Sequence, residues 1–198
     1  MDTSKPIKSL SFDGKVAFFF EDSPINHPLG RYHSTLSLIL KDIEKCGAPG
    51  SNELAFPRAI CSMVAFDLLA KMHAGSDNTG KVRERFTQFT QFALGKRGRK
   101  QVGEKVYAFR NALHHSYRLA SEWKRKGAVV DWRFRLIDDI NEQRLMWNYK
   151  QSTIINLPSL QKELCQGITK LRSDVKQNKF EPMFDKYGWL IVGNLSHK

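Results

Sequence analysis

The hydrophobic positions of this chain recur mostly at helical spacing. Apolar residues three and four apart predict a helix that begins near Tyr32 and ends at Gly47, and further helices over residues 57–73, 81–94, 101–120 and 158–177. The helix over 57–73 is apolar nearly all round, which is typical of a helix in a core or in a dimer interface. The pattern therefore predicts a mainly α protein with four to five helices.

Strand patterns occupy the remaining segments. Residues 1–30 predict an irregular arm with one strand at 16–20, since Pro24 and Pro28 break any longer element. Residues 128–137 and 144–149 predict the two strands of a small β-hairpin around the polar segment 138–142. The tail from residue 179 onward predicts no particular element.

Length and composition place these elements in one unit. The 198 residues suit a single domain, and 41% hydrophobic residues with 13 Phe favour a folded chain over a disordered one. We therefore expect one domain over 1–198, with a helical core at 30–125, a hairpin at 128–149 and a C-terminal helix at 158–177.

The charge is positive and unevenly distributed. Of the formal net charge of +12, a net +10 lies between residues 81 and 126, where thirteen Lys or Arg face three Glu. A cationic loop lies in the middle of this region and contains Lys96, Arg97, Arg99 and Lys100. Such a field attracts the phosphates of RNA, although a charged loop is more often simply solvated.

Several classes of protein are not indicated. No stretch has the roughly 18 uninterrupted apolar residues of a membrane span, and the N-terminus lacks a signal-peptide core, so no membrane contact and a cytoplasmic location are expected. Three distant cysteines predict buried or idle thiols rather than disulfides or a zinc site. His27 and His33 could bind a metal in principle, but no Cys or carboxylate cluster accompanies them, so neither metal nor cofactor is expected.

The strongest chemical signal lies in residues 109–118, where Arg110 and two histidines share a helical segment without a carboxylate. A permanently charged Arg beside a His that titrates near neutral pH suits phosphate-ester chemistry without a metal. At about 100° per residue, Arg110 and His114 lie one turn apart on the flank of the buried stripe, whereas Arg110 and His115 are about 140° apart. Either the helix distorts near His115, or a second copy in a symmetric dimer contributes to the site.

This segment resembles the signature of the HEPN superfamily, in which an Arg, often followed by a polar residue, precedes a His by four to six residues. Arg110 and His115 bracket four residues, Asn111 fills the polar slot, and Tyr117 follows. The resemblance covers roughly residues 30–125. It implies a HEPN-like helical bundle and a homodimeric, metal-independent ribonuclease of the toxin, toxin–antitoxin or anti-phage (abortive infection) type, although some members are non-catalytic.

The resemblance also implies roles for individual residues. His115 would move the proton in a transesterification by the RNA 2′-hydroxyl, Arg110 would hold the scissile phosphate, and Asn111 would orient the His or the phosphate. His114 is the rival for the catalytic role, since it shares a helical face with Arg110. RNA contacts are expected from a wider set, namely His114, Tyr117, Arg118, Lys96, Arg97, Arg99 and Lys100.

Three functions therefore compete. The first is an endoribonuclease with a composite dimer site, held in check by an antitoxin or another regulatory protein. The second is a non-catalytic HEPN module that binds nucleic acid or supports a defence complex. The third is a dimeric helical scaffold whose basic face serves solubility or an acidic protein partner.

Overall fold

The computed structural model describes residues 5–27, 30–47, 54–95, 100–115, 119–125, 128–178 and 189–192. The helices are α1 (Lys5–Lys8), α2 (Phe12–Phe20), α3 (Thr35–Cys46), α4 (Ala55–Ala74), the 3-10 helix η2 (Thr79–Lys81), α5 (Val82–Leu94), α6 (Lys100–His115) and α7 (Leu157–Asn178). The strands are β1 (Ile25–His27), β2 (Gly30–Ser34), β3 (Ala120–Arg125), β4 (Ala128–Ile137), β5 (Met146–Tyr149), β6 (Ser152–Asn156) and β7 (Trp189–Val192). The prediction of a mainly helical protein is confirmed.

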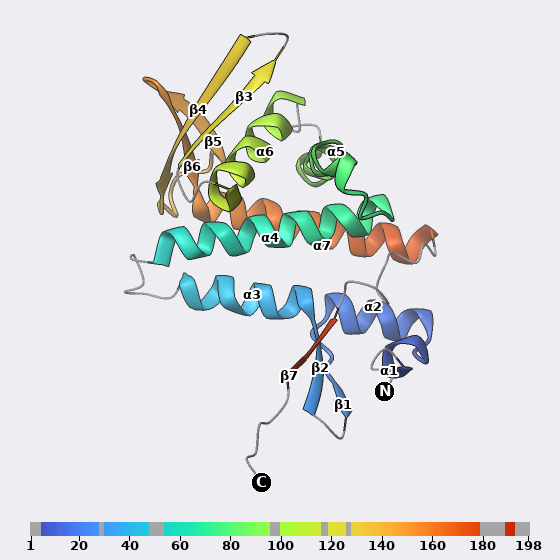
Figure 1. Cartoon of the computed structure of the whole chain (residues 1–198). Coiled ribbons are helices and arrows are strands. Elements are labelled where there is room, and N and C mark those ends of the chain that lie inside the picture. Colours follow the sequence, from blue (N-terminus) through green and yellow to red (C-terminus); the bar gives the residue numbers. More distant parts are fainter. Residues whose placement is uncertain are drawn as a thin grey trace.

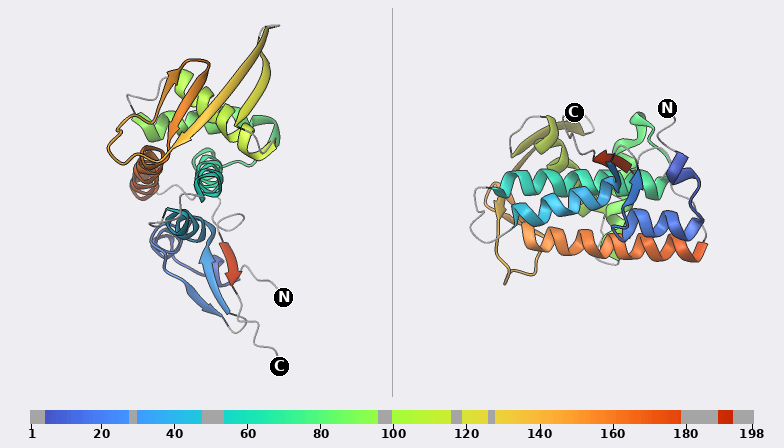
Figure 2. Two further views of the ribbon diagram at one scale, coloured as in Figure 1. Left: turned by 90° about the vertical axis from the view of Figure 1, so that its left-hand side faces the viewer. Right: turned by 90° about the horizontal axis from the view of Figure 1, so that it is seen from below.

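The helices form stacked layers. Figure 1 shows α3, with α2 beyond its end, below α4 and α7, while α5 and α6 lie on the other side of α4. One hydrophobic core runs through these layers and contains the fully buried rings of Phe66, Phe86, Phe89 and Phe109. A sheet of four strands and a sheet of three strands lie at opposite ends of the molecule (Figure 2). Six described helices have nine or more residues, so the expected number of four to five is too small.

The strand expected at residues 16–20 is wrong, because this segment is the helix α2. Ser11 caps the helix by accepting a hydrogen bond from the Gly14 amide at 3.2 Å. Val16 and Phe19 pack into the main core, whereas Phe18 packs into a second, smaller cluster with Tyr32. A helix buried on two sides loses the polar stripe that would have identified it, and a short apolar run then resembles a strand.

The first predicted helix begins later than expected. Tyr32 is completely buried but belongs to β2, and α3 begins after Ser34, whose side chain accepts the Ser37 amide at 2.9 Å. The end at Gly47 is confirmed, since its amide donates to the carbonyls of the last turn. β2 pairs with β1 on one side and with β7, from the chain's C-terminal tail, on the other.

The predicted β-hairpin is wrong in its pairing, although β4 has the expected bounds. The four-stranded sheet has the order β3-β4-β6-β5, in which β4 pairs with β3 and runs parallel to β6, and β5 pairs only with β6. Asn156, at the end of β6, is fully buried and donates to the carbonyls of Asp139 at 2.9 Å and Glu142 at 2.8 Å. These bonds hold the loop after β4 against β6, so β4 cannot fold back on β5.

The predicted helix over 101–120 is too long at its C-terminal end. α6 ends at His115, and Ala120 begins β3. Pairing with β4 starts directly before β3, where the Phe134 amide donates to the Leu119 carbonyl at 2.7 Å. The helical core expected over 30–125 therefore has a strand at each of its ends, β2 and β3. The C-terminal helix expected at 158–177 is present as α7.

Candidate active site

Helix α6 carries the Arg-His segment and is held from several sides. Val106, Phe109 and Leu113 are buried in the main core, as their helical spacing predicts. The helix packs on α5 and α4 and against strands β3 and β4. Such packing fixes the rotation of α6, and with it the direction in which the intervening polar residues point.

Arg110 reaches from α6 to an aspartate on α4. Its Nη2 lies 3.4 Å from Oδ2 of Asp67, and its Nη1 donates to Oδ1 of Asn111 at 3.1 Å. The side chains of Arg110 and Asp67 are only 14% and 17% exposed. The guanidinium is therefore held at the α4–α6 contact by two neighbours, and only a small part of it meets solvent.

Asp67 is a site residue that sequence reasoning missed. Besides Arg110, the Nζ of Lys71 lies 4.0 Å from its Oδ2. Its Oδ1 is buried and accepts no hydrogen bond from the described residues. One carboxylate thus lies between two cations, and the cluster keeps a net positive charge. The sequence does contain one indication that Asp67 is special, because it is the only charged residue between positions 59 and 70.

The other residues of the segment are described to different extents. His114 is partly buried, which agrees with its predicted position on the flank of the buried stripe, and Asn111 is partly buried as well. His115 is the last residue of α6, but its side chain lies outside the described part of the chain, as do Tyr117 and Arg118. The choice between His114 and His115 as the catalytic residue stays a prediction.

The basic region is only partly a free cationic surface. Lys96, Arg97 and Arg99 lie outside the described residues, as does the side chain of Lys100. Of the described cations, Arg85 is 4% exposed and donates to the Asn78 carbonyl at 2.6 Å, and Arg83 pairs with Glu104 at 3.3 Å. Lys105 donates to Asn148 at 2.9 Å. These three cations hold elements together, so they are less available for direct contact with RNA phosphates.

The thiols and histidines named in the sequence offer no competing centre among the described residues. Cys46, Cys61 and Cys165 form no disulfide within the described part of the chain. Burial raises the pKa of the Cys61 and Cys165 thiols, which makes them poorer nucleophiles. No group of three or more His, Cys, Asp or Glu in the described segments could hold a metal ion. His33 lies 3.9 Å from Asp22, and the side chain of His27 is outside the described part.

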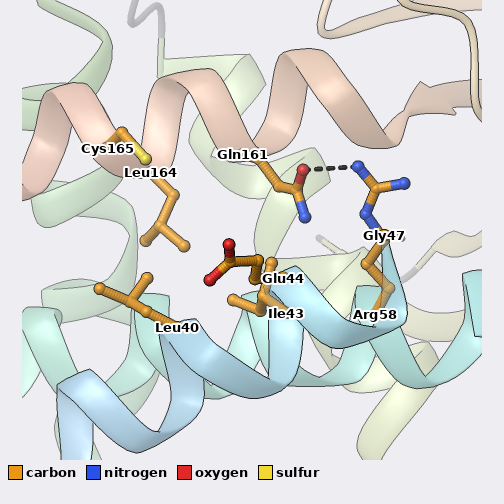
Figure 3. Close-up of a pocket in the computed structure, with 8 residues that line it drawn as sticks. All are labelled: Leu40, Ile43, Glu44, Gly47, Arg58, Gln161, Leu164 and Cys165. Carbon is orange, nitrogen blue, oxygen red and sulfur yellow. Dashed lines mark hydrogen bonds between the residues drawn. The ribbon is translucent and has the colours of Figure 1, made fainter. Parts of the chain in front are cut away.

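A separate pocket lies between α3, α4 and α7 (Figure 3). It has a volume of about 390 Å³ and is lined by Leu40, Ile43, Glu44, Gly47, Arg58, Gln161, Leu164 and Cys165. Arg58 is 8% exposed and already pairs with Asp138 at 2.7 Å and with Gln161 at 2.5 Å. Arg58 and Asp67 are nine positions apart on α4, which is about 180° around the helix, so this pocket is on the side of α4 away from Arg110.

Comparison with known proteins gave no match to a family model, a curated protein or a solved structure. None of the helices in the described segments combines the length and the apolar composition that a membrane span requires.

Proposed function

We propose that this protein is a metal-independent endoribonuclease of the HEPN kind that acts as a homodimer. The observation that carries the proposal is the fixed guanidinium of Arg110, held by Asp67 and Asn111 on the helix that ends at His115. A cation that is oriented before substrate arrives can stabilise charge on a phosphate without reorganising. The two cations around Asp67, Arg110 and Lys71, leave this cluster with a net positive charge, which suits a phosphate.

In this proposal the reaction needs only the RNA and the protein. The 2′-oxygen attacks the adjacent phosphorus, its proton passes to His115, and the bond to the 5′-oxygen breaks as that oxygen receives a proton. The products are a 2′,3′-cyclic phosphate and a 5′-hydroxyl. Arg110 would neutralise the charge that develops on the phosphate. DNA would not be cut, because it lacks the 2′-hydroxyl.

The cellular role belongs to the same proposal. A ribonuclease without a metal requirement would be active wherever RNA is present, so an antitoxin or another regulatory protein would hold it inactive. We propose a toxin or anti-phage effector in the cytoplasm. The cationic residues Lys96, Arg97, Arg99, Lys100 and Arg118, with Tyr117 and His114, would bind the RNA strand.

The test is cleavage of labelled total RNA in EDTA by the wild type and by the Arg110→Ala, His114→Ala and His115→Ala variants. We expect the wild type to produce cyclic-phosphate ends and Arg110→Ala and His115→Ala to lose at least about 100-fold in rate, within the range for a catalytic acid–base group. Arg31→Ala removes an exposed cation of β2, in the three-stranded sheet at the other end of the molecule, and serves as the matched control. Loss in His114→Ala alone would reassign the catalytic histidine.

One observation favours the non-catalytic alternative. Arg110 is mostly buried and paired with a carboxylate, which also suits a residue that only joins α4 to α6. If the wild type binds RNA but leaves it intact in EDTA and also with added Mg²⁺, the binding module replaces the enzyme as the best description.

A further inference from the structure

The four-stranded sheet has one face that packs on α6 and one that does not. On the packed face, Trp132 and Phe134 of β4 join the main core, and Phe134 lies 5.2 Å from the ring of Phe109 on α6. Asn148 and Thr153 belong to the same face, where Lys105 of α6 bonds to Asn148. Side chains alternate along a strand, so the residues between these point to the opposite face.

The opposite face combines cations with aromatic rings. The strand register brings Arg135, Ile154 and Trp147 into one row across β4, β6 and β5. Tyr149 follows two residues after Trp147 and is 51% exposed. Ile154, in the middle of the row, is only 7% exposed and Trp147 is partly buried, but neither belongs to a hydrophobic cluster of the described residues. Figure 2 (left) shows α6 behind this sheet, and no described helix or strand crosses in front of it.

The cations of this face lie against its rings. The guanidinium of Arg144 is 4.4 Å from the centre of the Trp147 ring, and Lys150 is 5.6 Å from that of Tyr149. Glu142 holds Arg144 in place through a 2.6 Å ion pair. Arg135 is exposed and forms no ion pair with any described residue. The rings and cations are therefore arranged before any ligand binds.

Apart from Glu142, which is paired with Arg144, the described carboxylates of this face lie at its other edge. Glu122 of β3 and Asp131 of β4 are register partners, and Asp131 pairs with Arg133 at 3.1 Å. The cations without an ion pair among the described residues, Arg135 and Lys150, lie toward β5 and β6. A polyanion would therefore be attracted to the half of the face that also carries the rings.

We propose that this face, the sheet platform formed by Arg135, Arg144, Trp147, Tyr149 and Lys150, binds single-stranded RNA. Unpaired bases stack on aromatic rings and on guanidinium planes, while cations nearby neutralise the phosphates. A duplex would present its phosphates but not its bases, and an acidic peptide would leave the rings unused. The platform is separate from Arg110 and does not depend on the proposed cleavage.

The experiment measures binding of a fluorescent 12-nucleotide oligouridylate by anisotropy, using full-length His115→Ala protein so that cleavage cannot interfere. We expect Tyr149→Ala and Arg135→Ala each to weaken binding about fivefold or more, and Tyr149→Phe to bind like the parent because it keeps the ring. Arg31→Ala removes an exposed arginine from the other sheet and should change affinity less than twofold.

Three outcomes would overturn the proposal. The first is that the parent protein binds no oligouridylate at about 50 mM salt. The second is that Tyr149→Ala binds as tightly as the parent while its circular dichroism is unchanged. The third is that a polyglutamate peptide binds in a manner that depends on Arg135 and not on Tyr149, which would identify a protein partner instead. If the wild type binds oligouridylate through the platform but does not cleave RNA, only the proposed ribonuclease activity is contradicted. The two proposals can therefore be rejected independently.

Discussion

At the scale of single residues, the environment of Arg110 determines what it can do. An arginine on a free surface would swing between ligand and solvent, whereas this one is held by Asp67 from α4 and by its neighbour Asn111. Removing one member of a mostly buried ion pair leaves the other charge without its counterion. Asp67 is therefore a positioning residue for Arg110, and it contributes to stability as well.

We expect the Asp67→Asn variant to lose about 1–3 kcal/mol of unfolding free energy, since a hydrogen bond to a charged group is lost or weakened. A double-mutant cycle with Arg110→Leu, followed by chemical denaturation, isolates the pair from other effects. The coupling free energy between Asp67 and Arg110 should exceed about 0.5 kcal/mol. Lys71→Met is the matched control, because its Nζ lies farther from Asp67, at 4.0 Å, and should couple more weakly. A coupling near zero between Asp67 and Arg110 would show that the contact holds neither residue.

The partner of Arg110 illustrates what the sequence could and could not predict about the site. The Arg-His segment and its position on the flank of a buried helix follow from local spacing. Asp67 is 43 residues away from Arg110, and only the packing of α4 against α6 brings the two together. A lone carboxylate in an apolar helix indicates a buried partner but does not identify it.

At the scale of elements, long periodic hydrophobic patterns predict the secondary structure correctly, whereas short apolar runs do not. The helices expected at 57–73, 81–94 and 158–177 are found as α4, α5 and α7. α5 and α7 each bury an apolar stripe over three or more turns, whereas α4 is apolar nearly all round but is far longer than a typical strand. The sequence of α2 resembles that of a strand because this short helix is buried on two sides and has no polar stripe. The sheet order depends on the buried Asn156 and on a parallel pairing of β4 with β6, which no local pattern encodes.

The crossing of α7 over α5 requires a small residue at position 167. A Cβ added at Gly167 would lie 2.9 Å from the Cβ of Ala93 and 3.3 Å from the ring of Phe89. Alanine would gain about 1 kcal/mol of helix propensity, but overpacking costs about 1–3 kcal/mol. We therefore expect Gly167→Ala to lower the melting temperature, measured by circular dichroism.

Two further variants check this explanation. Gln166→Ala changes an exposed neighbour on the same helix and should leave the melting temperature nearly unchanged. Ala93→Gly makes room for the new methyl group, so the double variant should be more stable than the two single effects predict. A rise in melting temperature for Gly167→Ala would mean that the helices separate at little cost.

At the scale of the whole molecule, the positive charge has at least two uses. Arg83, Arg85 and Lys105 join elements of the fold, and this part of the charge is not available to a ligand. The sheet platform lies on the face of the sheet away from α6, whereas Arg110 lies where α6 meets α4. An RNA strand bound on the platform would therefore need to pass around the edge of the sheet to reach Arg110 in the same chain, or extend to a second copy.

A dimer would explain how RNA on the platform reaches an Arg110 side chain. It would also explain how Arg110 and His115, which point in widely different directions on one helix, can act on the same phosphate. We expect purified protein to have twice the 22.8 kDa mass of one chain in light scattering.

If the site takes Arg110 from one protomer and His115 from its partner, mixing the inactive Arg110→Ala and His115→Ala variants restores cleavage. Equal mixing of exchanging chains makes about half of the dimers mixed, and each mixed dimer has one complete Arg-His pair across its two-fold axis. Mixing either variant with the Arg110→Ala/His115→Ala double variant should restore nothing. Failure to recover activity, when mass analysis shows that mixed dimers have formed, would place Arg110 and His115 in one chain and require α6 to distort at its end.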